Sequence, residues 1–76
     1  MNIDRRKRLV KISDAIAELS SDIEGIMEEE QEYYDNMPES FQNGEKGDLA
    51  QTAIDALQSA QDNCDEIIGS IEEATA

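Results

Sequence analysis

The chain has 76 residues, a net charge of −13, one Cys and no His, which allows one domain with a small core and argues against a catalytic cleft. A single Cys excludes an internal disulfide, the lack of His excludes the usual zinc sites, and the acidic balance argues against nucleic acid or an anionic membrane as a direct partner. No apolar run approaches the roughly 20 residues of a membrane span, and the basic start lacks the apolar core of a signal peptide, so we expect a soluble protein of a reducing compartment.

The charge is segregated along the chain. Residues 1–11 hold five basic residues and Asp4, whereas 18 acidic residues from position 12 onward face Lys46 alone. Asn2 or Asp4 is expected to cap a helix that begins at about residue 3. In a folded-back chain the basic tip would lie beside the acids near the C-terminus. Charge complementarity between the two ends then explains the basic residues, and the alternative is a functional basic patch.

The first predicted helix covers residues 3–36. Its apolar residues recur at alternating spacings of three and four, which is the heptad pattern of a coiled coil, and Glu30 interrupts it at one a position. Residues that share a heptad letter form a column along the helix. The predicted seam consists of Leu9, Ile16, Ile23 and Met37 in the a column and Ile12, Leu19, Ile26 and Tyr33 in the d column.

The end of this helix is densely acidic, although a helix C-terminus favours cations. Two interpretations stay open: a solvated face that serves solubility, or a patch kept for a basic protein partner. All three aromatic residues lie at the same end. Tyr34 and Phe41 could anchor such a contact, or Phe41 could fold with Met37 over the open end of the seam. The predicted partner-binding residues are Glu28, Glu29, Glu32, Tyr34, Asp35 and Phe41.

A connection is expected over residues 37–47. Pro38 should end the first helix and could open one short helical turn. Gly44 and Gly47 are expected to supply left-handed or tight loop conformations. Asp48 with Gln51 three residues later is a variant of the capping box, so we predict that the second helix covers residues 48–74.

The second predicted helix repeats the spacing of three and four. If the chain folds back, a positions meet d positions at a constant sum of residue numbers, which pairs Ile23 with Ala60 and Leu19 with Cys64. Cys64 then packs as a small hydrophobe. The seam consists of Ala50, Leu57, Cys64 and Ile71 in the a column and Ala53, Ala60, Ile67 and Ala74 in the d column.

These patterns predict an all-α fold: a single domain, residues 1–76, that forms an antiparallel two-helix coiled-coil hairpin. Met27, Ile54 and Ile68 lie at e positions outside both seams and widen the apolar stripe beyond what one partner helix covers. A second copy of the hairpin would bury these three residues, so we expect a homodimer in the form of a four-helix bundle with them at the dimer interface. The alternative is a monomer whose flanks stay exposed or serve another partner.

No catalytic, cofactor-binding or metal-binding constellation is apparent. A general acid needs a desolvated pocket, which a two-helix rod lacks, and the acids of the connection do not match a calcium-binding loop. We therefore expect no enzyme activity, no cofactor and no metal. The one specific hint is that acids such as Asp14, Glu18 and Asp22 recur at intervals of four, close to the phosphate spacing along a nucleic-acid strand.

Residues 32–42, Glu-Tyr-Tyr-Asp-Asn-Met-Pro-Glu-Ser-Phe-Gln, resemble a pattern in small acidic helical proteins of tailed bacteriophages. The resemblance implies an accessory protein in the cytoplasm of a bacterial host that binds and inhibits a host protein, and it assigns no catalytic residue. The leading hypothesis is a non-catalytic inhibitor that occupies a basic, nucleic-acid-binding surface of a host defence protein by nucleic-acid mimicry. The alternative is a structural coiled-coil assembly module with no inhibitory role.

Overall fold

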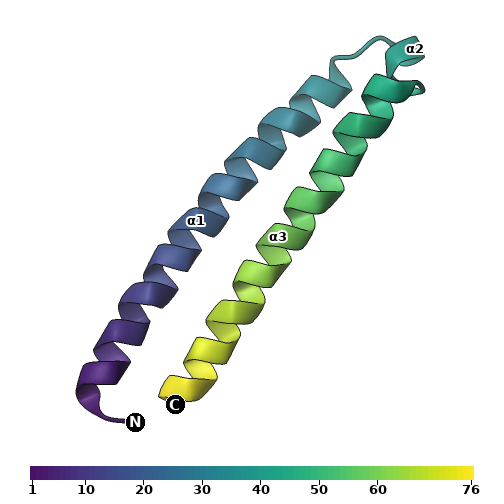
Figure 1. The fold of residues 1–76 in the computed structure, drawn as a ribbon. Helices are drawn as coiled ribbons and strands as arrows, with labels where there is room; N and C mark the ends of the chain where they lie inside the picture. Colours follow the sequence, from purple (N-terminus) through teal and green to yellow (C-terminus); the bar gives the residue numbers. More distant parts are fainter.

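The computed structural model describes residues 1–76, and these are almost entirely helical. α1 covers Ile3–Asp35, α2 is a single turn over Glu39–Gln42, and α3 covers Glu45–Thr75. In Figure 1, α1 and α3 lie side by side, the chain turns back through α2, and both termini lie at the same end of the rod. The rod measures 58 × 15 × 12 Å. The prediction of an all-α chain with two long helices in contact is confirmed.

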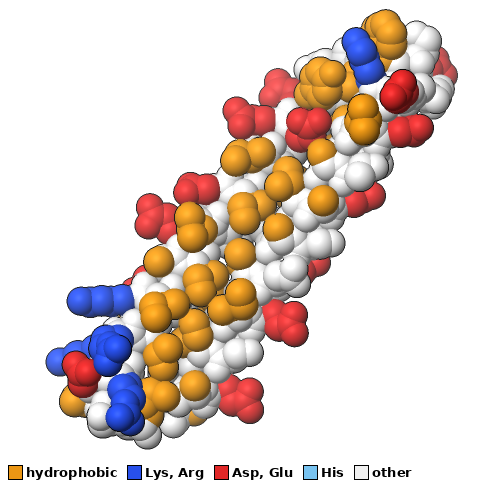
Figure 2. Space-filling model, viewed as in Figure 1, with side chains coloured by type: hydrophobic (Ala, Val, Ile, Leu, Met, Phe, Trp, Pro, Cys, Tyr) orange, Lys and Arg blue, Asp and Glu red, His pale blue; other side chains and the backbone are white.

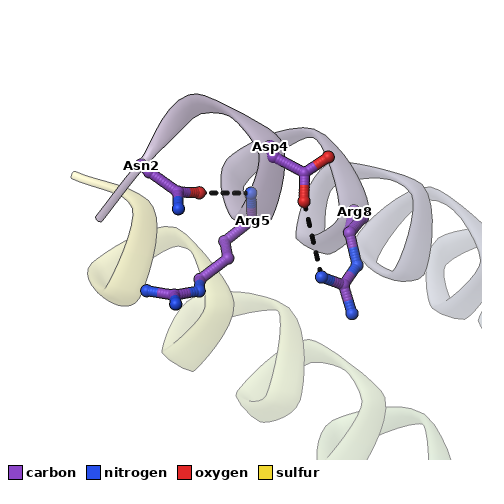
Figure 3. Close-up of polar contacts among 4 residues, drawn as sticks. All are labelled: Asn2, Asp4, Arg5 and Arg8. Carbon is purple, nitrogen blue, oxygen red and sulfur yellow. Dashed lines mark hydrogen bonds and ion pairs between the residues drawn. The ribbon is translucent and has the colours of Figure 1, made fainter.

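Side chains close the outer ends of the two long helices. Asn2 Oδ1 accepts a hydrogen bond from the backbone N–H of Arg5 at 2.8 Å, so Asn2 is the N-cap of α1 (Figure 3). At the end of α3, the Thr75 hydroxyl donates to the carbonyl of Ile71 at 3.0 Å. The Asn2 contact satisfies a backbone N–H that the start of α1 leaves without an internal partner. The Thr75 hydroxyl also lies 3.2 Å from the carbonyl of Glu72, one of the last four carbonyls of α3.

The two long helices are joined by a compact corner, residues 36–47. Pro38 precedes α2, as expected for a residue that cannot continue α1 but suits the start of a helical turn. Gln42 Nε2, at the end of α2, donates to the carbonyl of Tyr34 at 2.9 Å. The corner therefore caps the C-terminal end of α1 with a side chain that comes from eight residues further along the chain.

α3 begins at Glu45, three residues before the predicted start. Gly44 is its N-cap and makes no side-chain hydrogen bond. The backbone N–H of Asp48 donates to the carbonyl of Gly44 at 3.0 Å, so Asp48 lies inside the first turn. The predicted capping box of Asp48 and Gln51 is therefore wrong, because the turn at Gly44 lets the helix start earlier.

Gly47 is required by close packing and not by its backbone angles. No residue of the chain has a positive φ, so of the two loop conformations expected for Gly44 and Gly47, left-handed or tight, the left-handed one does not occur. Gly47 is buried inside α3, where a Cβ atom would lie 2.5 Å from the carbonyl carbon of Gln42 and 2.7 Å from its Cα. The lack of a side chain thus lets α2 lie directly on α3.

The interface between α1 and α3 uses the a and e columns of both helices, not the predicted a and d columns. Ser20 and Ile54, both in e columns, are 8% and 9% exposed. Gln61, another e residue, donates to the carbonyl of Ser20 at 3.4 Å. The buried or half-buried residues of these columns are Leu9, Ser13, Ile16, Ser20, Ile23, Met27, Glu30 and Tyr34 on α1 and Gly47, Ala50, Ile54, Leu57, Gln61, Cys64, Ile68, Ile71 and Thr75 on α3. Two small residues of the d column of α3, Ala53 and Ala60, are half-buried at the edge of the interface.

The physical reason for this rotation is the width of the apolar stripe. Three columns, d, a and e, carry apolar residues, and one partner helix covers only two of them. On α3 the e column offers Ile54 and Ile68, whereas the d column offers Ile67 and three Ala residues, so turning the e column of this helix inward buries more apolar area on α3. On α1 the same rotation buries the small Ser20, which lies opposite Gln61, and leaves the larger Leu19 exposed.

The three residues predicted for the dimer interface therefore lie elsewhere. Met27 and Ile68 are half-buried and Ile54 is buried within the single chain, all in the contact between α1 and α3. The expectation that they lie outside that contact is wrong, because the interface is rotated toward them. Leu19 is 58% exposed, so its predicted burial against Cys64 is wrong for the same reason.

Candidate functional site

The acidic side chains make almost no ion pairs, although Asp35, Asp55 and Asp62 each accept a hydrogen bond from a Gln side chain. The only ion pair of the molecule joins Arg8 Nη1 to Asp4 Oδ2 at 3.5 Å, within the first turns of α1 (Figure 3). No ion pair connects the basic tip to the acids at the end of α3, so the expected charge complementarity between the two ends does not include a direct contact between side chains. The acidic residues after the tip carry uncompensated charge, which a partner or salt must screen.

The predicted partner-binding residues do not form a single patch. Glu28, Glu29, Glu32 and Asp35 are all exposed near the end of α1, and together they are called the acidic cluster below. Tyr34 is half-buried in the e column toward α3. Phe41 is half-exposed on α2, with Lys46 Nζ 5.2 Å from its ring centroid. Tyr34 is therefore turned away from the acidic cluster, and the charged group that lies over the Phe41 ring is a lysine.

A continuous apolar surface follows from the rotated interface. The large side chains of both d columns stay outside it and are between 49% and 58% exposed, whereas the small Ala53 and Ala60 are half-buried at its edge. Figure 2 shows the resulting stripe of hydrophobic side chains along the helix pair, with acidic side chains at its margins. We call this surface the apolar face; it consists of Ile12, Leu19, Ile26 and Tyr33 of α1 and Ala53, Ala60, Ile67 and Ala74 of α3.

Helix geometry explains why both d columns lie on one side. On each helix the d column lies about a quarter turn from the centre of the a and e columns, which face the other helix. α3 runs back alongside α1 (Figure 1), so the direction of rotation from the contact to the d column is reversed on α3 when both helices are viewed from the same end. Both d columns therefore lie on the same side of the helix pair. The stripe that one helix pattern would give is thus doubled in width.

The apolar face carries no charge between Arg5 at one end and Lys46 at the other. Its edge on α3 is formed by uncharged residues such as Ala56 and Asn63, and its edge on α1 holds Asp22 and the acidic cluster's Glu29. At the corner, a shallow hollow extends the face; Tyr33, Asn36, Met37, Pro38, Phe41 and Lys46 line it. A long, uncharged and shallow surface of this kind suits contact with another helix more than capture of a small molecule.

The sequence contains a signal for this surface that the heptad pattern concealed. Eight d positions compete for the same interface with four e positions that carry large apolar or aromatic residues, Met27, Tyr34, Ile54 and Ile68. The choice between the two columns depends on side-chain size and not on spacing. The e column of α3 has two Ile residues, Ile54 and Ile68, whereas its d column has Ile67 alone among three Ala residues, and this comparison would have favoured the e column of α3.

The structure offers no group suited to hold a metal ion, and no helix combines the length and hydropathy that crossing a membrane requires. Cys64 is free and half-buried in the contact between α1 and α3. Comparison of the chain with protein-family models, with curated proteins and with solved structures finds no match in any of the three.

Proposed function

We propose that the chain is a non-catalytic protein-binding module, an antiparallel helical hairpin whose apolar face binds an α-helical surface of another protein chain. The observation that carries the proposal is the apolar face itself: five large side chains stay about half exposed along one uncharged stripe. Monomeric proteins seldom leave contiguous apolar surface of this extent uncovered.

The energetics set the kind of partner. Full burial of a large apolar side chain contributes about 1.5–3 kcal/mol, so covering the exposed halves of five contributes about 4–8 kcal/mol. Association costs about 4–15 kcal/mol in lost freedom of the two bodies. The face therefore binds only a partner that brings a comparable apolar stripe, as an amphipathic helix or helix pair does.

A second candidate function uses the acidic surface. All four residues of the acidic cluster are exposed and none of them is in an ion pair, which favours a partner with a basic surface. In this proposal the hairpin acts as an inhibitor of a bacterial host protein, by occupying a site that otherwise binds nucleic-acid phosphates. The inhibitor depends on the acidic cluster, whereas a structural assembly module would depend on the apolar face. The apolar face and the acidic cluster must therefore be tested separately.

The test compares two variants for capture of partners from bacterial lysate at low and high salt. Leu19→Glu with Ile26→Glu disrupts the apolar face, and replacement of the four residues of the acidic cluster by Lys disrupts the acidic surface. Val10→Glu is the matched control, because Val10 is 51% exposed but lies outside the d columns. Partners lost only with the face variant, at either salt, support the leading proposal; partners lost only with the lysine variant and at high salt support the inhibitor. Unchanged capture by the face variant would refute the leading proposal.

A further inference from the structure

The two ends of the rod differ in charge. The corner end, residues 28–48, contains eight acidic residues and one Lys. The end with the termini, residues 1–11 and 65–76, contains five basic and five acidic residues and is balanced. Because the rod is 58 Å long, the two ends are separated by several Debye lengths at ordinary salt.

We propose that the apolar face is covered by a second copy of this chain, docked in the opposite orientation along the rod. This inference rests on the proposed role of the apolar face as a protein-binding surface. In this arrangement a two-fold axis runs perpendicular to the rod and passes its middle. It places the apolar face of one copy on the apolar face of the other, and the corner end of each copy beside the end of the other copy that holds the termini. The alternative, with corresponding ends together, covers the same apolar residues but places two strongly acidic corners on each other. Charge therefore decides between the two orientations.

The apolar face matches itself under this operation. The hydrogen bond between Gln61 and Ser20 sets the levels of the two helices, so the midpoint of the α1 column, between Leu19 and Ile26, lies close to the level of Ala60. A crossing axis at that level places Leu19 opposite the partner's Ile26. On α3 it places Ala60 opposite the partner's Ala60 and Ile67 opposite the partner's Ala53. The small Ala60 at the axis allows the two α3 helices to approach closely.

The resulting assembly is a four-helix bundle whose intermolecular contact differs from the one expected from the heptad pattern. Its contact residues are the d columns, and the e columns stay within each chain. The interface is isologous, since the same surface of each copy contributes the same residues, and it closes after two copies.

The experiment combines sedimentation equilibrium with single-cysteine cross-linking in a Cys64→Ser background. Ala60→Cys should form a disulfide-linked dimer under mild oxidation, because the two copies of position 60 meet at the axis. Ala53→Cys is the matched control: it lies seven residues away, so its two copies would be about 20 Å apart, beyond disulfide reach. Leu19→Glu with Ile26→Glu should weaken self-association by about 100-fold or more, and Val10→Glu should leave it unchanged.

Two results would overturn the inference. A wild type that is monomeric at about 100 µM rejects the second copy as occupant. A dimer in which position 53 cross-links as readily as position 60, or in which neither does, rejects the opposed orientation. A monomeric wild type whose captured partner is lost in the Leu19→Glu and Ile26→Glu variant rejects only this inference and leaves the proposed function standing. Circular dichroism of each variant verifies that helicity is retained, so a loss of association reports the interface.

Discussion

Replacing Gly47 by Ala tests whether the corner is held by direct contact between α2 and α3. In an unobstructed helix, Ala is favoured over Gly by about 0.5–1 kcal/mol, because it restricts the unfolded chain. At Gly47, the added methyl group would lie 2.5 Å from the carbonyl carbon of Gln42 and 2.7 Å from its Cα. Both are backbone atoms, so no side-chain rotation relieves the overlap, and α2 must move away from α3.

The magnitude follows from what that movement disrupts. Overpacking of this kind costs about 1–3 kcal/mol. Displacing Gln42 also weakens the 2.9 Å hydrogen bond from its side chain to the Tyr34 carbonyl, worth about 1 kcal/mol. After subtracting the propensity gain, we expect a net destabilisation of about 1–3 kcal/mol. A change of 1 kcal/mol shifts the Tm of a domain of this size by about 4–8 °C, so the Tm should fall clearly.

Gly25 and Gly69 provide matched controls, because a Cβ atom at either position would meet nothing within 4 Å. Gly25→Ala and Gly69→Ala should each raise the Tm by a few degrees, reflecting the gain of about 0.5–1 kcal/mol. Thermal and urea unfolding followed by far-UV circular dichroism, at one protein concentration, measures all three variants. If Gly47→Ala is as stable as Gly25→Ala, the close approach of α2 to α3 is refuted.

Three further predictions concern polar contacts and charge. Gln42→Ala should destabilise the fold by about 1 kcal/mol in urea unfolding by removing the cap on the Tyr34 carbonyl. Gln58→Ala removes only an exposed helix-surface hydrogen bond to Asp62 and should cost about 0.2–0.5 kcal/mol; equal losses would contradict a special role for Gln42. Replacing the acidic cluster by Lys should preserve the far-UV spectrum and raise the Tm, because cations suit the end of α1, and a loss of helicity would speak against this. Raising salt from about 0.01 M to 1 M should raise the Tm of the wild type by screening its net charge of −13, and a Tm independent of salt would contradict the uncompensated charge.

The extent to which the fold follows from the sequence differs between its parts. Spacings of three and four fix helix periodicity, and Asn2 and Pro38 mark boundaries through backbone chemistry, so the helices could be predicted closely. The rotation of the interface could not be read from spacing, because three apolar columns satisfy the same period. Its choice depends on the area buried by residues such as Ile54 against that of Ala53, which is a property of both helices together.

The candidate site was predicted less well for the same reason. The acidic cluster was expected to be exposed, and it is, because unpaired carboxylates avoid burial. Tyr34 was misplaced because its exposure depends on the rotation of α1. The role of Gly47 lies in a contact between α2 and α3, and a single glycine in a sequence does not distinguish a close approach from a special turn.

The compact corner has a consequence for how the chain folds. Its contacts join residues close in sequence, such as Gln42 and Tyr34, so closing this loop costs little entropy. Contacts between the far ends of α1 and α3 close a loop of nearly the whole chain and form cheaply only after the helices are already joined at the corner. We therefore expect the contacts between the two helices to form first at the corner and then progressively toward the termini. The same order predicts that transient opening of the native rod starts at the end where the termini lie.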